Sequence, residues 1–464
     1  MNNSSLQDTE TLLAQHNQQH LLRFCEQLSD SELQLLLSQI DQIDFSLLST
    51  APEATTTHNV PRAECAVAPS SVIARPNSAA DHQIRGNAEE TGCRLIGDGK
   101  VAVITVAGGQ GSRLGFEHPK GMYPIGPKSD RTLFQIYAEQ ILARRRKHDA
   151  LIPWYLMTSA ATHEETIAFF ERNGFFSLDP DTVFFFQQAS LPAIDAETGA
   201  ILMDSSGSLC LSPDGHGGMV TALQSSGCLE ALKNYGVEHL FYHQVDNPTA
   251  IICDPVLVGL HAERQSQLTT LVVRKTDPEE RMGVLVDISG RTEIIEYSEL
   301  TPEQASASDE SGQWIFWAGN TAIHVFRRDF LEFLTEDDTS LPLHRAHKKI
   351  KCIDPAGDTT ESQQRDAVKF ERFIFDALPM ADRTLIVEGD RQREFNPVKN
   401  AAGNDSPQTA RSALSRIGRQ WLQAAGQAVA NDTVVEISPL LALTAEDLCG
   451  RLPSRDFTIE DLTG

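Results

Sequence analysis

The stretch VAVITVAGGQGSRLGFEHPK at residues 101–120 constrains the fold of this chain more than any other part of it. Its first six residues are apolar, which predicts a strand buried on both faces of a sheet. Glycines follow at positions 108, 109, 111 and 115. A buried strand that ends in glycines lets closely spaced backbone amides approach a ligand, and such amides attract phosphate oxygens. The pattern predicts a phosphate-binding loop.

Two cations accompany this loop. Arg113 offers a planar fork for phosphate oxygens, and Lys120 offers a mobile point charge. The loop is not a Walker A motif, because neither Gly111 nor Gly115 is followed by Lys and Ser or Thr at the required spacing. A dinucleotide fingerprint would place its third glycine at Leu114. We therefore predict a nucleoside-triphosphate site, and nicotinamide chemistry is disfavoured.

Composition limits the partners of the chain. A length of 464 residues predicts about two or three domains. The formal net charge of −25 argues against nucleic acid or an anionic membrane as a partner. A polar, acidic N-terminus predicts no signal peptide, and no apolar run is long enough to predict a membrane span. Eight singly scattered cysteines predict neither a zinc site nor disulfides, and we expect a cytoplasmic protein.

The organisation along the chain predicts an α/β protein. Residues 8–48 have helical periodicity, with Asp30 as the expected N-cap of a second helix, and residues 49–95 have the composition of a linker or a loosely packed wrap. Strand and helix patterns then alternate. We predict an N-terminal helical region with linker at 1–95, a catalytic domain at 96–400 and a small C-terminal region at 401–464. Strands are expected at 101–106, 154–157, 183–186 and 239–245, helices from Thr132 and at 163–172, and a hairpin at 283–298.

Three further segments carry candidate chemistry. Asp246 ends a core strand, where ligands of open α/β sheets bind, and a carboxylate there suits Mg²⁺ bound with substrate phosphates; a capping Asp is the alternative. The turn PDGHGG, with Gly215 and His216, lets backbone amides face a base or sugar, although an ordinary Pro-Asp-Gly turn fits as well. Gln188 ends an apolar strand, and its amide can donate and accept at once, which suits recognition of uracil, although amides at strand ends are also common.

Several other residues are weak candidates when taken singly. Each also fits a solvated strand edge, turn or helix face, so each matters only if it converges on the first loop. They are Glu296 and Tyr297 in IIEYSE, Asn320 in AGN, Lys369 in KFERFIFD and Lys399 in FNPVKN.

Taken together, the segments resemble the UDP-N-acetylglucosamine pyrophosphorylases, within the UDP-sugar pyrophosphorylase family. The resemblance runs from about residue 100 to 440 through motifs that keep one order: VAGGQGSRLG, HPKGMYPIG, TLFQIYAEQIL, PWYLMTS, FFQQASLPA, PDGHGG, VDN, IIEYSE, AGN, KFERFIFD and FNPVKN. It implies a Rossmann-like nucleotidyltransferase domain, with a mixed central sheet and helices on both faces, flanked by smaller N- and C-terminal domains. It also implies Mg²⁺ and the reaction of UTP with N-acetylglucosamine 1-phosphate.

The resemblance also implies roles for individual residues. Arg113, Lys120 and Lys399 occupy positions that act on the phosphates in catalysis. The other nucleotide-binding positions are Ala107, Gly108, Gly109, Gln110, Gly111, Gln188, Gly215, Asp246 and Lys369, with Asp246 also the metal position. The sugar-binding positions are His216, Glu296, Tyr297 and Asn320.

One departure from the family pattern concerns the sugar. The acetylglucosamine enzymes usually have Asn where this chain has His216, and PDGHGG is closer to the form found in the glucose enzymes. Uridylyl transfer to glucose 1-phosphate or another hexose 1-phosphate is therefore the first alternative. A nucleotide-sugar sensor without turnover is the second, and the presence of Arg113, Lys120 and Asp246 argues against it.

The chemistry itself needs no general base. A sugar phosphate is already an anionic nucleophile near neutral pH, since its second pKa is about 6 by analogy with phosphoserine. The expected reaction is in-line attack on the α-phosphorus of UTP, in which the protein positions the reactants and neutralises charge.

Overall fold

The computed structural model describes residues 3–46, 62–336, 340–358 and 364–452. The chain forms two compact units, each assembled from three separate stretches. Unit 1 comprises Met1–Asn59, Gln188–Met219 and Leu341–Ile374, and unit 2 comprises Val60–Gln187, Val220–Ser340 and Phe375–Gly464. The domain boundaries predicted after residues 95 and 400 stay a prediction.

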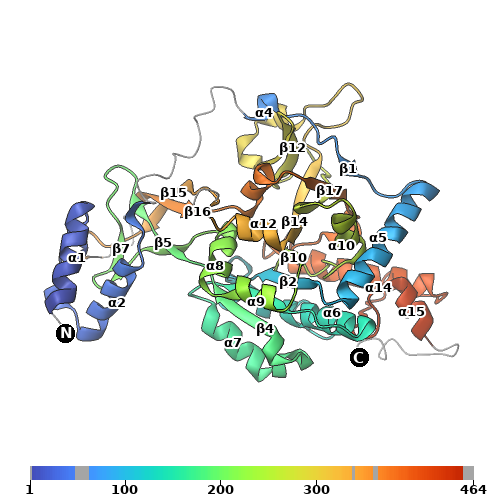
Figure 1. The fold of residues 1–464 in the computed structure, drawn as a ribbon, viewed down its shortest axis with the longest axis horizontal. Helices are drawn as coiled ribbons and strands as arrows, with labels where there is room; N and C mark the ends of the chain where they lie inside the picture. The colour runs from blue at the N-terminus through green and yellow to red at the C-terminus, as the bar shows by residue number, and fades with distance from the viewer. Residues whose placement is uncertain (1–2, 47–61, 337–339, 359–363, 453–464) are drawn as a thin grey trace. The chain divides into compact units, whose positions relative to one another are not determined.

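Unit 2 is built on a mixed sheet of ten strands, with the first motif near its middle (Figure 1). The strand order is β1-β17-β11-β14-β10-β2-β3-β4, and the hairpin of β12 and β13 joins through β14. Strands β10, β2, β3 and β4 are parallel, whereas β14 is antiparallel to β10 and β11. The bounds are β1 Val72–Ile73, β2 Val101–Val106, β3 Trp154–Thr158, β4 Val183–Gln187, β10 His239–Gln244, β11 Leu268–Arg274, β12 Val284–Ile288, β13 Arg291–Ile295, β14 Ala318–Arg327 and β17 Thr384–Glu388.

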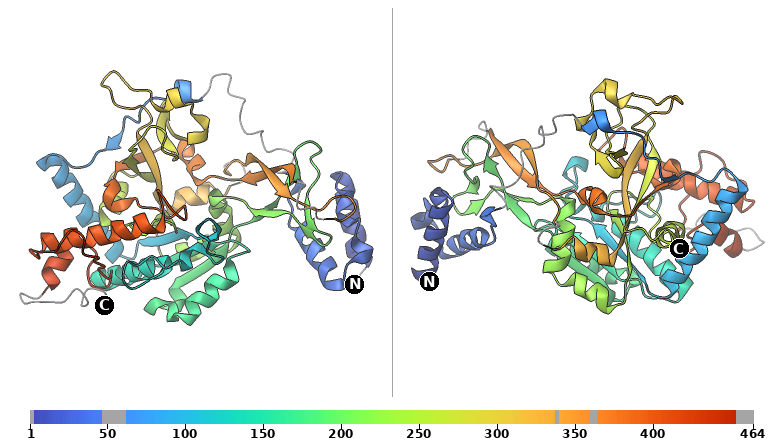
Figure 2. Two further views of the ribbon diagram at one scale, coloured as in Figure 1. Left: turned by 180° about the vertical axis from the view of Figure 1, so that it is seen from behind. Right: turned by 45° about the horizontal axis from the view of Figure 1, so that its top comes forward.

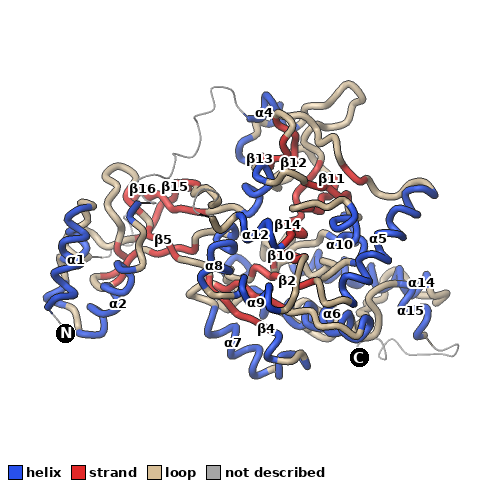
Figure 3. Tube along the Cα trace, viewed as in Figure 1, coloured by secondary structure: helices blue, strands red, loops and turns tan. Residues whose placement is uncertain are grey.

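Both faces of this sheet are covered by helices (Figure 3). Val101 and Val103 of β2 share one buried core with residues of α5, α6, α7 and α10. Side chains alternate along a strand, so Ile104 lies on the opposite face, and it is buried as well. On that face Tyr155 stacks on Phe184, which contacts Tyr235 at the end of α9. The helices of unit 2 are α4 Arg62–Cys65, α5 Ala79–Gly97, α6 Leu133–His148, α7 His163–Arg172, α9 Cys228–Asn234, α10 Pro255–Glu263, α11 Pro302–Ala305, α12 Arg328–Phe333, α13 Arg391–Glu394, α14 Pro407–Ala424 and α15 Ala445–Arg451, and α8 Met219–Ser225 begins at the unit boundary.

The strands, the later helices and the hairpin follow the sequence expectations closely. The strand at 101–106 has the predicted ends, and the strands expected at 154–157, 183–186 and 239–245 become β3, β4 and β10. Thr132 is the N-cap of α6, with its hydroxyl accepting the Gln135 N–H, and α7 spans the predicted residues. The predicted α/β class with a mixed central sheet is confirmed.

The linker expected at 49–95 is wrong in its second half. Residues 47–61 lie outside the described residues, but Ala79–Gly97 form α5. Ser78 starts this helix in a capping box with Asp81. The helix packs on α10 through Gly92, where a Cβ would lie 1.9 Å from the carbonyl oxygen of Pro255. Small residues make this contact, so the sequence lacks the large apolar periodicity that predicts a buried helix.

Unit 1 joins two N-terminal helices to small antiparallel sheets. Its core unites Leu13, Leu36 and Ile40 with Met203 and Phe370, which come from distant parts of the chain. Its helices are α1 Asn3–Gln15 and α2 Asp30–Asp41. Its strands are β5 Ser190–Pro192, β6 Ile194–Asp195, β7 Met203–Ser205, β8 Ser208–Leu209, β9 Leu211–Pro213, β15 His344–Lys351 and β16 Gln364–Glu371.

Two helical expectations in unit 1 need correction. The apolar residues between 16 and 28 lie in or next to two short 3-10 helices after α1 ends, where Leu21 and Phe24 still pack in the core. The N-cap of α2 is Ser29 rather than Asp30. Ser29 and Glu32 form a capping box, which supplies more hydrogen bonds than Asp30 alone would.

The C-terminal residues add α14 and α15 to unit 2. Figure 2 shows α14 running beside α6, and Ala410 of α14 belongs to the same core as α6. Ser406 caps α14, and Pro407 occupies its first turn. Among the described helices, none combines the length and the apolar character that crossing a membrane requires.

Candidate functional site

The glycine loop after β2 has an exposed row of backbone donors. Its framework is fixed by hydrogen bonds from Lys120 N–H to Gly109 O at 3.0 Å and from Gly111 N–H to His118 O at 2.9 Å. Within the described chain, no residue accepts a hydrogen bond from the N–H of Gly108, Gly109 or Gln110. A Cβ on Gly109 would meet open space. Consecutive unpaired amides of this kind form an anion-binding concavity.

The loop glycines have different roles. A Cβ on Gly111 would lie 2.7 Å from the carbonyl oxygen of Phe116, so this glycine is required by the fold of the loop itself. Gly115 has a φ of +68°, which favours glycine at the end of the turn Ser112–Leu114. Arg113 lies on that turn with an exposed side chain. The loop can therefore close tightly and still leave the amides of 108–110 accessible.

Lys120 and Asp246 converge beside the loop. The Nζ of Lys120 lies 4.0 Å from Oδ2 of Asp246, and their side chains are 19% and 14% exposed. Lys120 begins the short helix Lys120–Met122, whereas Asp246 follows β10. The two motifs are far apart in sequence, and parallel pairing of β10 with β2 brings their ends together. An ion pair that retains solvent access can bind phosphate oxygens and a cation at once.

Buried polar side chains form a hydrogen-bonded group near the end of β10. The Thr105 hydroxyl bonds to His243 Nε2 at 2.7 Å and accepts a hydrogen bond from the Trp154 indole. Burial lowers the pKa of His243 to about 3, so its ring is neutral. Tyr137 donates its hydroxyl proton to Val245 O at 3.0 Å. These hydrogen bonds connect β2, β3, β10 and α6 directly before Asp246. They hold the backbone of Asp246 in position.

The FNPVKN segment pairs with the residues that follow β10. Val398 N–H donates to Asp246 O at 2.7 Å, and Asn396 N–H donates to the Asn247 Oδ1 at 3.1 Å. The Asn247 amide also donates to Glu394 O at 2.7 Å. Asn247 is 3% exposed. The pairing places Lys399 next to the strand end that carries Asp246.

The sugar-position candidates of unit 2 gather around Gly283. Asn320 N–H donates to Gly283 O at 2.8 Å, and a Cβ on Gly283 would lie 2.7 Å from Glu296 Oε1. Burial raises the pKa of Glu296, a nearby Glu299 adds to the rise, and the charge of Lys399 opposes it. Tyr297 follows Glu296 with a half-exposed ring. Glu296, Asn320 and Lys399 therefore belong to one cluster.

Unit 1 gathers the remaining candidates. Gln188 is buried, and its side-chain amide donates to Gly215 O at 3.4 Å. Gly215 has a φ of +87°, and a Cβ there would lie 2.4 Å from the carbonyl oxygen of Arg372. The glycine turn therefore packs on the KFERF segment, in which Lys369 lies near the end of β16. The predicted uracil-binding pair and Lys369 come from one compact region.

His216 is held as a neutral donor. Its Nδ1 accepts the Ile374 N–H at 3.1 Å, so the proton of the neutral ring lies on Nε2. Burial lowers the pKa of His216 to about 4. An imidazole in this tautomer has one N–H donor, whereas an asparagine amide has two together with a carbonyl acceptor.

Comparisons with known proteins identify the family to which the chain belongs. Residues 56–444 match the family described as UTP–glucose-1-phosphate uridylyltransferase. The chain belongs to this family. It is 34% identical to the human UDP-N-acetylhexosamine pyrophosphorylase-like protein 1, over 98% of this chain and 96% of that protein. It is also 34% identical to the Saccharomyces cerevisiae UDP-N-acetylglucosamine pyrophosphorylase, over 95% of this chain and 96% of that protein.

The fold of the chain is also similar to that of a solved structure. The uridine diphosphate N-acetylglucosamine pyrophosphorylase of Trypanosoma brucei superposes with a TM-score of 0.81 at 28% identity, over 94% of this chain and 93% of that one. Membership in the uridylyltransferase family confirms the resemblance and the enzyme class predicted from the motifs. The roles of single residues stay predictions.

Sequence reasoning missed three polar residues that support the site in this uridylyltransferase family member. Asn247 stands in the sequence only as part of VDN, although it holds the FNPVKN segment. Asp214 and Arg372 form a buried ion pair at 3.3 Å, with the Arg372 N–H also bonded to Asp214 O. A Cβ on Gly218 would lie 2.0 Å from the Asp214 carboxylate, so this carboxylate fills the glycine turn. In the sequence, these three residues are marked only by their positions inside the motifs.

Proposed function

We propose that this protein transfers the uridylyl group of UTP to N-acetylglucosamine 1-phosphate and releases pyrophosphate. The observation that carries the proposal is the convergence of Lys120 and Asp246, 4.0 Å apart, beside the unpaired amides of the glycine loop. Such a site neutralises a triphosphate and its leaving group. A sensor that only binds UTP has no leaving pyrophosphate to neutralise.

The proposed reaction forms one bond and breaks one. A phosphate oxygen of the sugar phosphate attacks the α-phosphorus of UTP in line, and the bond from that phosphorus to the oxygen bridging to the β-phosphorus breaks. Pyrophosphate leaves with the electron pair. Arg113 and Lys120 stabilise its charge, and the loop amides of Gly108, Gly109 and Gln110 hold phosphate oxygens. Lys399 orients the attacking phosphate, which supplies its own negative charge.

The base and the sugar use different residues in this proposal. Gln188 and Gly215 contact uracil, and Lys369 contacts a phosphate. His216, Glu296, Tyr297 and Asn320 meet the sugar. The glycine turn supports the first role, because its backbone packs on 371–373 and keeps Gly215 in a fixed conformation. The cluster of Glu296 and Asn320 around Gly283 supports the second.

The carboxylate of Asp246 is a suitable ligand for Mg²⁺. Among the described residues, no group of three or more His, Cys, Asp or Glu side chains gathers into a metal site. Asp246 offers a carboxylate, and Mg²⁺ is commonly held by one or two carboxylates together with substrate phosphates. Bound there, Mg²⁺ would supply positive charge to the phosphate oxygens. Asp246 keeps its position through Val398 N–H, which donates to its carbonyl oxygen.

The sugar is assigned from the relatives and from His216. The human and yeast relatives carry names of N-acetylhexosamine and N-acetylglucosamine enzymes. The neutral His216, with its Nε2–H, can replace one of the donors of an asparagine amide. Glucose 1-phosphate stays the second candidate, because PDGHGG is closer to the glucose form. Pyrophosphate release from UTP with each sugar phosphate separates the two.

A cytoplasmic location completes the proposal. All eight cysteines lie among the described residues and have free thiols, which suits a reducing compartment.

A further inference from the structure

The turn that follows Lys120 connects the glycine loop to α6. We call residues 124–132 the connecting turn. Its two ends meet, because Pro124 and Thr132 pair and the N–H groups of Ile125 and Gly126 donate to Arg131 O at 2.9 and 3.0 Å. From the turn back to the loop, Tyr123 N–H donates to Lys120 O and Lys120 N–H donates to Gly109 O, both at 3.0 Å. The position of Lys120 therefore depends on where this turn is held.

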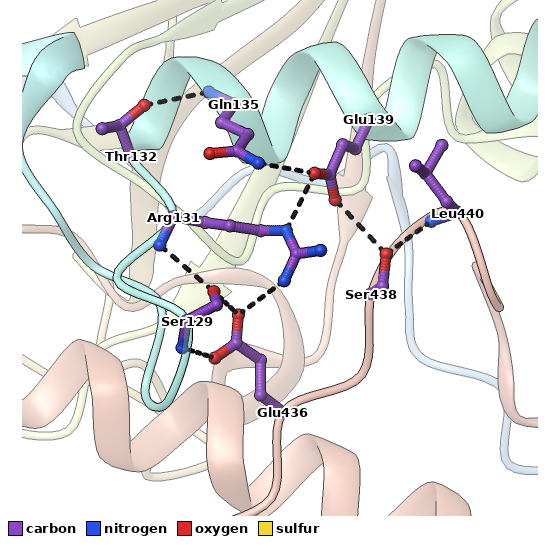
Figure 4. Close-up of polar contacts among 8 residues, drawn as sticks. All are labelled: Ser129, Arg131, Thr132, Gln135, Glu139, Glu436, Ser438 and Leu440. Carbon is purple, nitrogen blue, oxygen red and sulfur yellow. Dashed lines mark hydrogen bonds and ion pairs between the residues drawn. The ribbon is translucent and has the colours of Figure 1, made fainter. Parts of the chain in front are cut away.

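The turn is held by a carboxylate from the C-terminal part of the chain. Glu436 accepts hydrogen bonds from the Ser129 backbone N–H at 2.8 Å and from the Ser129 hydroxyl (Figure 4). It also accepts the backbone N–H of Lys128 at 2.7 Å. Glu436 is 7% exposed. A Cβ on Gly126 would lie 2.8 Å from Glu436 Oε1, so the carboxylate fills the concave side of the turn. A carboxylate that accepts main-chain donors fixes the backbone directly.

Arg131 adds a second link to the same segment. Its guanidinium donates to Glu139 Oε1 at 2.8 Å and lies 3.5 Å from Glu436 Oε1 (Figure 4). The Ser438 hydroxyl reaches the other oxygen of Glu139 at 3.4 Å. The side chains of all three charged residues are less than one-tenth exposed. The C-terminal segment thus binds both the turn and the first turns of α6.

Helix α14 makes a third, independent contact with the connecting turn. The Arg411 guanidinium donates to Pro124 O at 2.8 Å. Arg411 also pairs with the exposed Asp130 at 3.6 Å. The two C-terminal elements therefore reach both the start of the turn and its tip, and neither contains a residue assigned to substrate. The contacts of these two elements with the connecting turn therefore hold the turn in position.

We propose that Glu436 is a positioning residue for uridylyl transfer, which holds Lys120 beside Asp246 by fixing the connecting turn. The proposal rests on the role of Lys120 proposed above. Glu436 contacts no predicted substrate position, so it acts through the backbone of residues 124–132. A displacement of about 1 Å at a charged group can lower turnover by roughly 100-fold.

The first test compares Glu436 with an exposed carboxylate of the same segment. Glu436→Ala is expected to lower kcat about tenfold and to change the KM for UTP less than about twofold. Glu436→Gln should lose less, because an amide oxygen still accepts the two main-chain donors. Glu446→Ala and Glu446→Gln, on the exposed start of α15, are the matched controls with unchanged kcat. Assays run well below the melting temperature of every variant, with near-UV circular dichroism to verify folding.

A double-mutant cycle with Lys120→Ala separates positioning from a general structural role. If Glu436 acts through Lys120, Glu436→Ala should lower kcat about tenfold in the native background and less than about twofold in the Lys120→Ala background. Equal fold-losses in both backgrounds, or a native kcat in Glu436→Ala, would overturn the proposal. Should Glu436→Ala fail to fold, Glu436→Gln enters the cycle, with a smaller expected loss of kcat of about threefold in the native background and none in the Lys120→Ala background. Equal fold-losses of kcat in both backgrounds, or no loss in either, would overturn the proposal.

The same cycle keeps the two proposals apart. If Lys120→Ala itself retains kcat, the role of Lys120 is wrong, and the proposal for Glu436 falls with it. If Lys120→Ala loses kcat and the Glu436 effect is additive, only the proposal for Glu436 is wrong.

Discussion

Lys120 Nζ lies 4.0 Å from Asp246 Oδ2, although the two residues belong to motifs more than a hundred positions apart. Parallel pairing of β2 with β10 makes this proximity possible, because the carboxyl ends of parallel strands meet at one edge of a sheet. A cation and a carboxylate at the same edge can serve the leaving phosphates and a divalent ion together.

Lys120→Ala should reduce turnover far more than UTP affinity. The Nζ charge stabilises the leaving pyrophosphate mainly as the bond breaks, so we expect kcat to fall about 100-fold or more. The Kd for UTP, measured by calorimetry, should change by less than about tenfold. Lys233→Ala, on an exposed part of α9, is the control for loss of a lysine. A Lys120→Ala enzyme with near-native kcat would contradict the assigned role.

Asn247→Asp should loosen the segment that carries Lys399. The variant keeps the acceptor for Asn396 N–H but loses the donor to Glu394 O, and it turns a carboxylate oxygen toward that carbonyl. We expect the free energy of unfolding to fall by about 1–3 kcal/mol and the KM for the sugar phosphate to rise. Chemical denaturation and steady-state kinetics measure the two effects.

The control for Asn247→Asp is Asn87→Asp. Asn87 lies on the exposed side of α5, where its side chain accepts a hydrogen bond from Gln83. Asn87→Asp should leave the free energy of unfolding and the KM for the sugar phosphate unchanged within experimental error. Equal behaviour of the two variants would show that Asn247 does not hold the segment.

His216 should not titrate in the working pH range. Burial lowers its pKa to about 4, below its ordinary value, so the folded protein disfavours the protonated ring. The stabilising contribution is complete above about pH 6.5 and is lost as the pH falls toward 4. His216→Asn should therefore give the same pH profile of sugar-phosphate KM as the native enzyme between about pH 6.5 and 8. His216→Ala should raise that KM about two- to tenfold, through loss of one hydrogen bond. A native KM in His216→Ala would remove His216 from the sugar site.

Asp214→Asn should change how stability depends on pH. Burial raises the pKa of Asp214 to about 6, and the charge of Arg372 opposes this rise. An acid with a raised folded pKa binds its proton more tightly in the folded state, so its contribution to stability falls as the pH rises from about 4 to 6. The stability of the native protein relative to Asp214→Asn should decline over that interval, as urea denaturation at each pH would measure. Asp204→Asn, on an exposed strand, should show no such trend. A pH-independent difference for Asp214→Asn would contradict the raised pKa.

Much of the central fold could be predicted because its signals are local. The apolar run at 101–106 and the Thr132 cap define their elements through short-range patterns, and the structure places both as expected. Helix α5 could not be found in this way. Its contact with α10 uses Gly92 rather than large apolar residues, and only the folded chain shows the partner.

Candidate site residues could be predicted from the sequence only where the residue type itself suits the chemistry. Lys120 and Asp246 could be named because a cation and a carboxylate suit phosphates and Mg²⁺. Asn247 and Glu436 could not be identified from the sequence, because each accepts main-chain hydrogen bonds from a distant segment. Such contacts depend on tertiary pairing, and an isolated Asn or Glu in a sequence gives no sign of them.

The measurement that tests the central claim most directly is pyrophosphate release from UTP and Mg²⁺ with each of two sugar phosphates. With N-acetylglucosamine 1-phosphate, we expect pyrophosphate and UDP-N-acetylglucosamine in equal amounts, and a higher kcat/KM than with glucose 1-phosphate. Lys120→Ala under the same conditions is the control for contaminating activity. A higher kcat/KM with glucose 1-phosphate would contradict the assigned sugar. Binding of UTP without pyrophosphate release from either sugar phosphate would contradict uridylyl transfer.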